Sequence, residues 1–326
     1  MLFLNTILFF VDICEGAGEI LVVQLDNDDN YSSIQDAVNA AAVNDTVFVK
    51  SGFYFETIVI DKSILLVGED KNDTIISNNY SGFYAVFIKN SNVNLSGFTI
   101  KNSTVGIFLE GNDSIENVKI FDNILTNNKG GIYLGNGSNN NLIFKNLLFE
   151  NDGDGIRLYK SFENKIFDNN ITKQNSYGLI LWDSSCNNNI SNNFVYSNKN
   201  GIGIRRWSDN NFVNSNNISN NINLGLNLGF SYENTIINNE IFSNNNGILI
   251  SDSFNNNISK NTFKYNHKAV YLYDSKNNSI DDYNTFIEND EDISEGSKSF
   301  ETPGFGLILV LLSICFKIFK KKRNLQ

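Results

Sequence analysis

Aromatic and cationic side chains gather in one stretch of this sequence, at a nearly constant spacing. Both tryptophans and three of the four arginines of the chain lie between residues 157 and 207, and Tyr159, Trp182 and Arg205 follow one another at intervals of 23 residues. Flat aromatic faces can stack on sugar rings, and guanidinium groups pair with carboxylates or donate to hydroxyls. The candidate binding residues are Arg157, Tyr159, Trp182, Asp183, Arg205, Arg206 and Trp207.

Metal ligands are scarce. The cysteines are Cys14, Cys186 and Cys315, of which only Cys186 lies outside the apolar ends, and His267 is the single histidine. Without a CxxC motif or a histidine cluster, the sequence predicts no zinc or copper site and no disulfide framework.

The charge of the chain argues against nucleic acid as a partner. The formal net charge is −11, and five of the positive charges lie in the last ten residues, so the remainder carries −16. An acidic body repels phosphate backbones, whereas neutral glycans and cations are not repelled.

The middle of the chain consists of repeats. Each unit opens with Gly or Ala and an aliphatic residue, at steps of 22 to 25 residues. The openings are Gly106, Gly131, Gly155, Gly178, Gly201, Gly225, Gly247 and Ala269, with a less regular unit at Ala85. We therefore expect about eight tandem coils, with the opening glycine accommodating a turn conformation that other residues resist.

Each unit holds three short segments in which apolar and polar residues alternate. Such strands can pair only with their equivalents one unit away, which builds three parallel sheets around a narrow core, with about 4.8 Å between turns. The 59 asparagines of the chain fit the corners, where side-chain amides can form a hydrogen-bonded ladder.

The repeat also places the candidate binding residues. In each opening segment the third and fifth residues point outward, so these side chains lie beside one sheet in three successive coils. We expect them to line a shallow glycan-binding groove. The alternative is a surface of cation–π contacts and salt bridges that only solvates the sheet.

An end of such a solenoid needs a cap. Residues 32–42 predict a short amphipathic helix with Ser32 or Ser33 as N-cap, because Ile34, Ala37, Val38 and Ala41 share one face. Strands are expected at 46–50, 57–60 and 64–67.

The segment 33–70 and the later GIxL…NxIxxN coils resemble pectin-lyase-like proteins and the NosD-type repeat, which together cover about residues 30–288. The resemblance implies an all-β fold, a right-handed parallel β-helix. Its copper association is not expected here, because the ligands are missing. The resemblance also offers an alternative function, a polysaccharide lyase or hydrolase. A lyase would use Arg157, Arg205 or Arg206 with Ca²⁺, but Asp252 and Asp274 lie three and four coils from Asp183, too far for a hydrolase pair. We therefore name no catalytic residue and no cofactor.

Both ends predict an envelope location. The apolar run 2–13 followed by Gly16-Ala17-Gly18 is typical of a signal peptide, although no basic residue precedes it. Pro303-Gly304-Phe305, an apolar segment and a basic tail resemble the PGF-CTERM sorting signal of archaeal surface proteins. A plain membrane anchor is the alternative, and either places the body on the cell surface. The expected segments are a signal peptide (1–18), a cap with first strands (19–56), repeats (57–288), an acidic linker (289–303) and the sorting signal or transmembrane helix with its tail (304–326).

Overall fold

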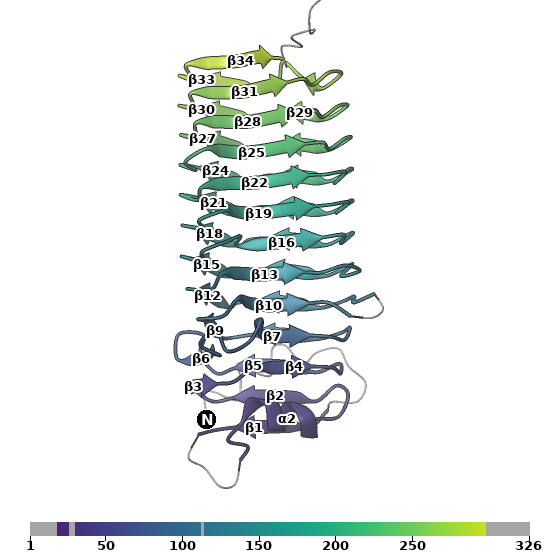
Figure 1. Cartoon of the computed structure of the whole chain (residues 1–326), viewed down its shortest axis with the longest axis vertical. Coiled ribbons are helices and arrows are strands. Elements are labelled where there is room, and N and C mark those ends of the chain that lie inside the picture. Colours follow the sequence, from purple (N-terminus) through teal and green to yellow (C-terminus); the bar gives the residue numbers. More distant parts are fainter. Residues whose placement is uncertain (1–17, 26–29, 112–113, 298–326) are drawn as a thin grey trace, which may run out of the picture. The chain divides into compact units, whose positions relative to one another are not determined.

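A computed structural model describes residues 18–25, 30–111 and 114–297 of the chain. These residues form a right-handed parallel β-helix in which short strands stack coil upon coil (Figure 1). The predicted fold class is confirmed. Most of the expected signal peptide, and the whole of the expected sorting signal and membrane anchor, lie outside the described residues.

Three parallel sheets make up the solenoid, and the chain visits sheet A, sheet B and sheet C in turn. Sheet A consists of β1 (Ile20–Val23), β2 (Thr46–Val49), β5 (Leu65–Gly68), β8 (Asn94–Ser96), β11 (Lys119–Phe121), β14 (Leu142–Phe144), β17 (Lys165–Phe167), β20 (Asn189–Ser191), β23 (Phe212–Asn214), β26 (Thr235–Ile237), β29 (Asn257–Ser259) and β32 (Ser279–Ile280).

Sheet B consists of β3 (Gly52–Phe55), β6 (Thr74–Ser77), β9 (Thr99–Lys101), β12 (Ile124–Thr126), β15 (Leu147–Phe149), β18 (Asn170–Thr172), β21 (Phe194–Tyr196), β24 (Asn217–Ser219), β27 (Glu240–Phe242), β30 (Thr262–Lys264) and β33 (Thr285–Ile287). Sheet C consists of β4 (Ile58–Ile60), β7 (Tyr84–Ile88), β10 (Val105–Leu109), β13 (Gly130–Leu134), β16 (Ile156–Tyr159), β19 (Tyr177–Trp182), β22 (Asn200–Arg205), β25 (Leu224–Gly229), β28 (Asn246–Ser251), β31 (Lys268–Tyr273) and β34 (Glu291–Gly296).

In the regular coils the core is a stack of aliphatic side chains, one from each strand of sheets A and B and two from each strand of sheet C. In one coil these are Ile190, Val195, Ile202 and Ile204, all fully buried. Complete burial of such a side chain contributes about 1.5–3 kcal/mol, and parallel pairing keeps each one above its equivalent in the next coil. The alternation inside one strand therefore sets which residues remain on the outer faces.

The opening glycines serve a different purpose from the predicted one. Among the described glycines only Gly97 and Gly137 have positive φ, so the unit openings are not in a left-handed conformation. A Cβ on Gly201 would lie 2.2 Å from the carbonyl oxygen of Gly225 in the next coil. Glycine is required there because neighbouring backbones approach closely, not because of the turn.

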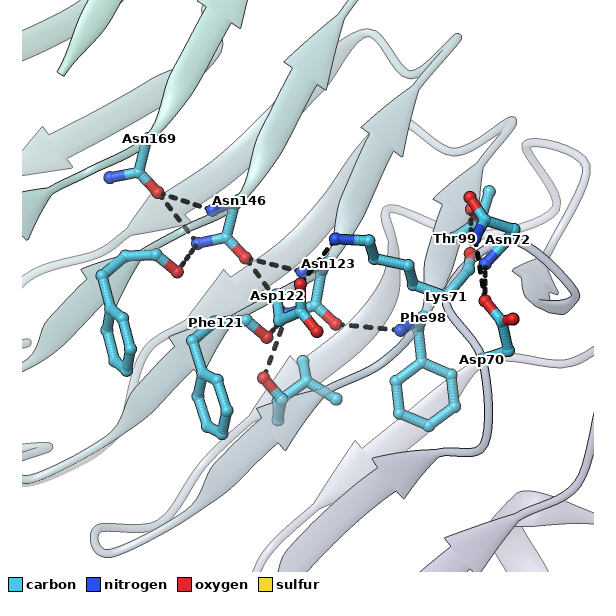
Figure 2. Close-up of polar contacts among 12 residues, drawn as sticks. Asp70, Lys71, Asn72, Phe98, Thr99, Phe121, Asp122, Asn123, Asn146 and Asn169 are labelled. Carbon is cyan, nitrogen blue, oxygen red and sulfur yellow. Dashed lines mark hydrogen bonds and ion pairs between the residues drawn. The ribbon is translucent and has the colours of Figure 1, made fainter. Parts of the chain in front are cut away.

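Asparagine ladders hold the corners, as predicted. Figure 2 shows Asn123, Asn146 and Asn169 in successive coils. The Oδ1 atom of Asn146 accepts the backbone N–H and the side-chain amide of Asn123, at 3.1 and 3.2 Å. The Oδ1 atom of Asn169 receives the same pair of bonds from Asn146. Each buried amide thus gains its partners from neighbouring coils, which removes the penalty for burying it.

One ladder is interrupted. The corner between sheets B and C carries Asn128, Asn151, Gln174, Asn198 and Asn221 in successive coils, each at most 2% exposed. The side-chain amide of Gln174 donates to two carbonyl oxygens, but its buried Oε1 has no hydrogen-bond partner. The extra methylene moves the acceptor away from the position that an asparagine oxygen occupies.

The predicted cap is a helix, α2 (Ile34–Ala40), which lies beside β1 and β2 at one end of the solenoid (Figure 1). The Ser33 hydroxyl accepts the backbone N–H of Asp36 at 3.2 Å, and Ile34, Ala37 and Val38 are buried against β1, β2 and β4. Within the described residues, no helix is long and apolar enough to cross a membrane.

The solenoid is longer than the repeats predict. Strand β1 precedes the helix and pairs with β2, and irregular coils fill the segment before β7, so each sheet has eleven or twelve strands instead of about eight coils. At the other end, β34 adds to β31 inside the segment 289–303 that was expected to be a linker.

Candidate functional site

The outer face of sheet C brings three candidate residues into line. Tyr159 on β16 pairs with Trp182 on β19, Trp182 pairs with Arg205 on β22, and Arg205 pairs with Gly229 on β25. The three side chains therefore occupy equivalent outward positions in successive coils, as the 23-residue spacing predicts. Adjacent coils are about 4.8 Å apart, which is close enough for direct contact along the column.

Two guanidinium groups lie close to one indole at the centre of this column. The Cζ atoms of Arg205 and Arg206 lie 5.3 and 4.4 Å from the centroid of the Trp182 ring. Within the described part of the chain, neither arginine forms an ion pair with a carboxylate. The Nε of Arg205 is buried without an acceptor, and Gly229 leaves room beside it, since a Cβ there would lie 3.2 Å from that atom.

Lys160 and Asp183 extend the cluster along its edge. The Nζ of Lys160 lies 5.1 Å from the ring centroid of Tyr159 and 3.7 Å from a carboxylate oxygen of Asp183. The Tyr159 hydroxyl and then the Asp183 carboxylate raise the pKa of Lys160. Lys160 therefore stays charged and holds the one acidic candidate residue, while the two arginines have no such partner.

An inserted residue strains the corner after β19 and after β22. After β16, β25 and β28 one residue separates the last outward residue of sheet C from a buried serine, and the Ser161 hydroxyl donates to the carbonyl of Tyr159, two residues back. Ser185 and Ser208 donate instead to carbonyls three residues back. The inserted residues Ser184 and Trp207 have φ of 63° and 58°.

These two corners differ from the equivalent one after β13, where the inserted residue with positive φ is Gly137. Left-handed conformation costs a non-glycine residue about 1 kcal/mol or more. Trp207 has this backbone conformation and also a side chain in contact with solvent, since it is 56% exposed. Positive φ also occurs at the same corner of other coils, for example at Lys160 and Phe230, so the exposed indole distinguishes Trp207 more than its backbone conformation does.

Arg157 does not join the cluster. Arg157 is the third residue of its repeat unit and points outward from β16. Its Nε donates to the buried carboxylate of Asp154 at 2.7 Å, and its guanidinium lies 5.0 Å from the Tyr133 ring centroid. Burial raises the pKa of the Tyr133 hydroxyl, and the Asp154 carboxylate adds to the effect. Arg157 is therefore already neutralised, unlike Arg205 and Arg206.

An aromatic group that the sequence did not suggest as a site lies on β7 and β10 of sheet C. Phe83, Tyr84, Phe87 and Phe108 are in mutual ring contact, and Phe83 is 56% exposed. Phe87 pairs with Phe108 across β7 and β10. In the less regular unit that opens at Ala85, Phe87 is the third residue, which is an outward position. The repeat spacing therefore already indicates that Phe87 lies on the outer face.

Asp183 and Asp252 lie far apart, as the repeat spacing predicts. Asp183 follows β19 and Asp252 follows β28, three coils further, which corresponds to roughly 14 Å. The two carboxylates of a glycosidase are about 5–9.5 Å apart. These two residues therefore do not form a hydrolase pair.

A family model described as "Periplasmic copper-binding protein (NosD)" matches residues 38–224 and 203–301. The chain belongs to the NosD family. None of the curated proteins searched matches this NosD-family chain.

Copper ligation finds no support in the residues of this NosD chain. Within the described residues, no group of three or more His, Cys, Asp and Glu side chains could hold a metal ion. The Nδ1 of His267 lies 2.8 Å from a carboxylate oxygen of Asp290, and burial raises the pKa of the Cys186 thiol, which disfavours the thiolate that copper requires. The donor set does not fit a copper site.

Solved structures similar to this NosD chain include several enzymes. The mannuronan C-5 epimerase AlgE4 A-module of Azotobacter vinelandii aligns with a TM-score of 0.63 at 16% identity, over 82% of this chain and 92% of the epimerase chain. DFA-IIIase from Arthrobacter chlorophenolicus A6 aligns with 0.67 at 14%, over 87% of each chain. The Dettilon tailspike protein (gp208) aligns with 0.62 at 15%, over 86% and 69%. At these identities the likeness establishes the fold alone.

Proposed function

We propose that this NosD-family protein binds glycans at the cell envelope, through the outer face of sheet C around Trp182. The observation that carries the proposal is the pair of guanidinium groups beside the Trp182 indole, with neither arginine paired to a carboxylate in the described part of the chain. The neighbouring cations Lys160 and Arg157, by contrast, pair with Asp183 and Asp154. Unpaired donors beside an aromatic ring suit a ring of sugar hydroxyls or carboxylates.

Several further features support this proposal. The epimerase named above acts on mannuronan by its title, which makes polysaccharide a reasonable ligand class for the same solenoid. The periplasmic description of the family agrees with the apolar run 2–13 and with the order Pro303-Gly304-Phe305, apolar segment and basic tail. We therefore place the solenoid on the outer side of the membrane, tethered through its C-terminus.

The proposal is tested by screening the purified full-length protein against immobilised polysaccharides, both acidic and neutral. We expect retention on at least one glycan, and loss of that retention when Trp182 and Trp207 are both replaced by alanine. The same fractions are assayed for unsaturated uronides. Release of such products would favour the lyase alternative over a binding protein, and unchanged retention of the double variant would contradict the proposed site.

A further inference from the structure

We infer that sheet C recognises a linear glycan of about five sugar residues or more, which lies across successive coils and ends on a second aromatic platform at β7 and β10. The inference rests on the proposed function and specifies it further. It concerns the length and direction of the ligand, and it assigns a binding role to Phe83, Tyr84, Phe87 and Phe108.

The platform is a compact set of rings on the outer face of sheet C. The ring centroids of Phe87 and Phe108 are 5.3 Å apart with planes 28° from parallel, and Tyr84 stacks on Phe108 at 6.3 Å. Phe83 meets Phe108 edge-on at 5.8 Å and is 56% exposed. Phe83 is exposed and the other three rings are partly exposed, so the outer side of the platform is accessible to a ligand.

Aromatic side chains continue from the platform to Trp182 in two adjacent columns of sheet C. Phe108 pairs with Tyr133 on β13 in the first column, where Arg157 follows on β16. Tyr159 on β16 pairs with Trp182 on β19 in the second column. Every coil of sheet C from β7 to β19 thus carries an outward aromatic side chain. These five coils span four steps, or roughly 19 Å along the solenoid axis.

The arrangement of these aromatic side chains sets the direction of the ligand. Inside one strand the side chains alternate between core and surface, so a ligand lying along a strand meets at most two outward rings. A ligand lying across the coils meets a ring in each of them. Because a sugar residue in an extended chain advances by nearly the same distance as one coil, a chain of about five residues reaches from Trp182 to the platform.

Cations beside the rings favour a saccharide over an apolar protein surface. The Nζ of Lys89 lies 5.8 Å from the Phe87 ring centroid, and Lys160 and Arg205 stand beside Tyr159 and Trp182 in the same way. Sugars present flat apolar faces edged by hydroxyls, and they can stack on rings while accepting hydrogen bonds from such cations. An apolar protein partner would leave these charges buried and unpaired.

The test uses the full-length protein and two series of oligomers of two to eight residues, oligogalacturonates and cello-oligosaccharides, measured by calorimetry. For a series that binds, we expect the affinity to rise with length to about five residues and then to level. Replacing Phe108 by alanine should weaken the octamer by about tenfold and leave the dimer unchanged. Phe108→Leu, which keeps the apolar volume without a flat face, should behave in the same way if the ring stacks on sugar.

A matched control is Phe144→Ala, which removes a stacked ring from sheet A, 5.0 Å from Phe121 and 4.9 Å from Phe167. It should bind every oligomer as the unmodified protein does. If the Phe108 variants bind the octamer as tightly as the unmodified protein does, while Trp182→Ala loses binding, this inference is overturned and the proposed function stands. Absence of binding at every length in both series would overturn both.

Discussion

The guanidinium of Arg206 lies over the indole of Trp182, with 4.4 Å between its Cζ and the ring centroid, although the two residues belong to different coils. Arg206 begins the strained corner after β22, and Trp182 ends β19. The contact therefore links a corner with an inserted residue to the column of outward side chains on sheet C. Rigid aromatic and cationic groups held in this way can bind a ligand with little loss of conformational entropy.

The asparagine ladders should carry much of the stability of the solenoid. Replacing the buried Asn244 by alanine removes the acceptor of two bonds from Asn221 and the donor to Asn266. We expect a loss of about 3 kcal/mol in the free energy of unfolding, because buried N–H groups remain without partners. The neighbouring exposed residue provides the control, since Asn245→Ala should change the urea midpoint very little. Equal effects of the two substitutions would contradict the role assigned to the ladder.

Repairing the interrupted ladder should stabilise the protein. In Gln174→Asn the shorter side chain would place its oxygen where it can accept the backbone N–H and the side-chain amide of Asn151. The Oδ1 atom of Asn198 accepts the backbone N–H of Gln174 in this way. We expect a gain of about 1 kcal/mol, measured as a higher urea midpoint, with slower hydrogen exchange at Asn151. Destabilisation by this substitution would show that Gln174 fills space that asparagine cannot.

Cys186 should help to hold the exposed Trp207. Its thiol donates to the Trp207 carbonyl at 3.3 Å and accepts the backbone N–H of Asp209 at 3.2 Å. In a protein with Trp182 replaced by phenylalanine, the fluorescence reports on Trp207 alone. Cys186→Ser keeps both bonds and should preserve its emission maximum, whereas Cys186→Ala should shift it to the red. Identical spectra for the two variants would exclude this positioning role.

Asp209 should make stability depend on pH. Burial raises the pKa of its carboxyl group, and Glu233 adds to the effect. The folded state then binds the proton more tightly than the unfolded state, so this contribution to stability is present below the ordinary carboxyl pKa and is lost as the pH rises through the raised one. Asp209→Asn can still accept the N–H of Tyr232 and should be more stable than the unmodified protein at pH 7, with the difference vanishing in acid. A constant difference between the urea midpoints at pH 7 and in acid would refute this.

The features that depend on regular patterns can be predicted from the sequence. The helix follows from the spacing of Ile34, Ala37 and Val38, and the column Tyr159, Trp182, Arg205 follows from the repeat because parallel strands keep equivalent residues in register. Strand β1 was missed because its four residues lie before the helix and belong to no repeat, although they pair with β2.

The remaining features depend on packing that the spacing does not encode. Arg157 fits the pattern of a site residue, yet a buried carboxylate three positions earlier takes its guanidinium, which only the structure reveals. Likewise, a coil that is one residue longer does not say where the extra residue lies. The hydrogen bonds of Ser185 and Ser208 locate it at Ser184 and Trp207.

Glycan affinity of the full-length protein with and without the Trp182 indole tests the account most directly. On a polysaccharide that retains the unmodified protein, Trp182→Ala should weaken binding by about tenfold or more, since it removes the ring that Arg205 and Arg206 both contact. The variant Phe167→Ala, which removes a stacked ring from sheet A, should bind normally. Undiminished binding by Trp182→Ala, or equal losses in both variants, would contradict a glycan site on sheet C.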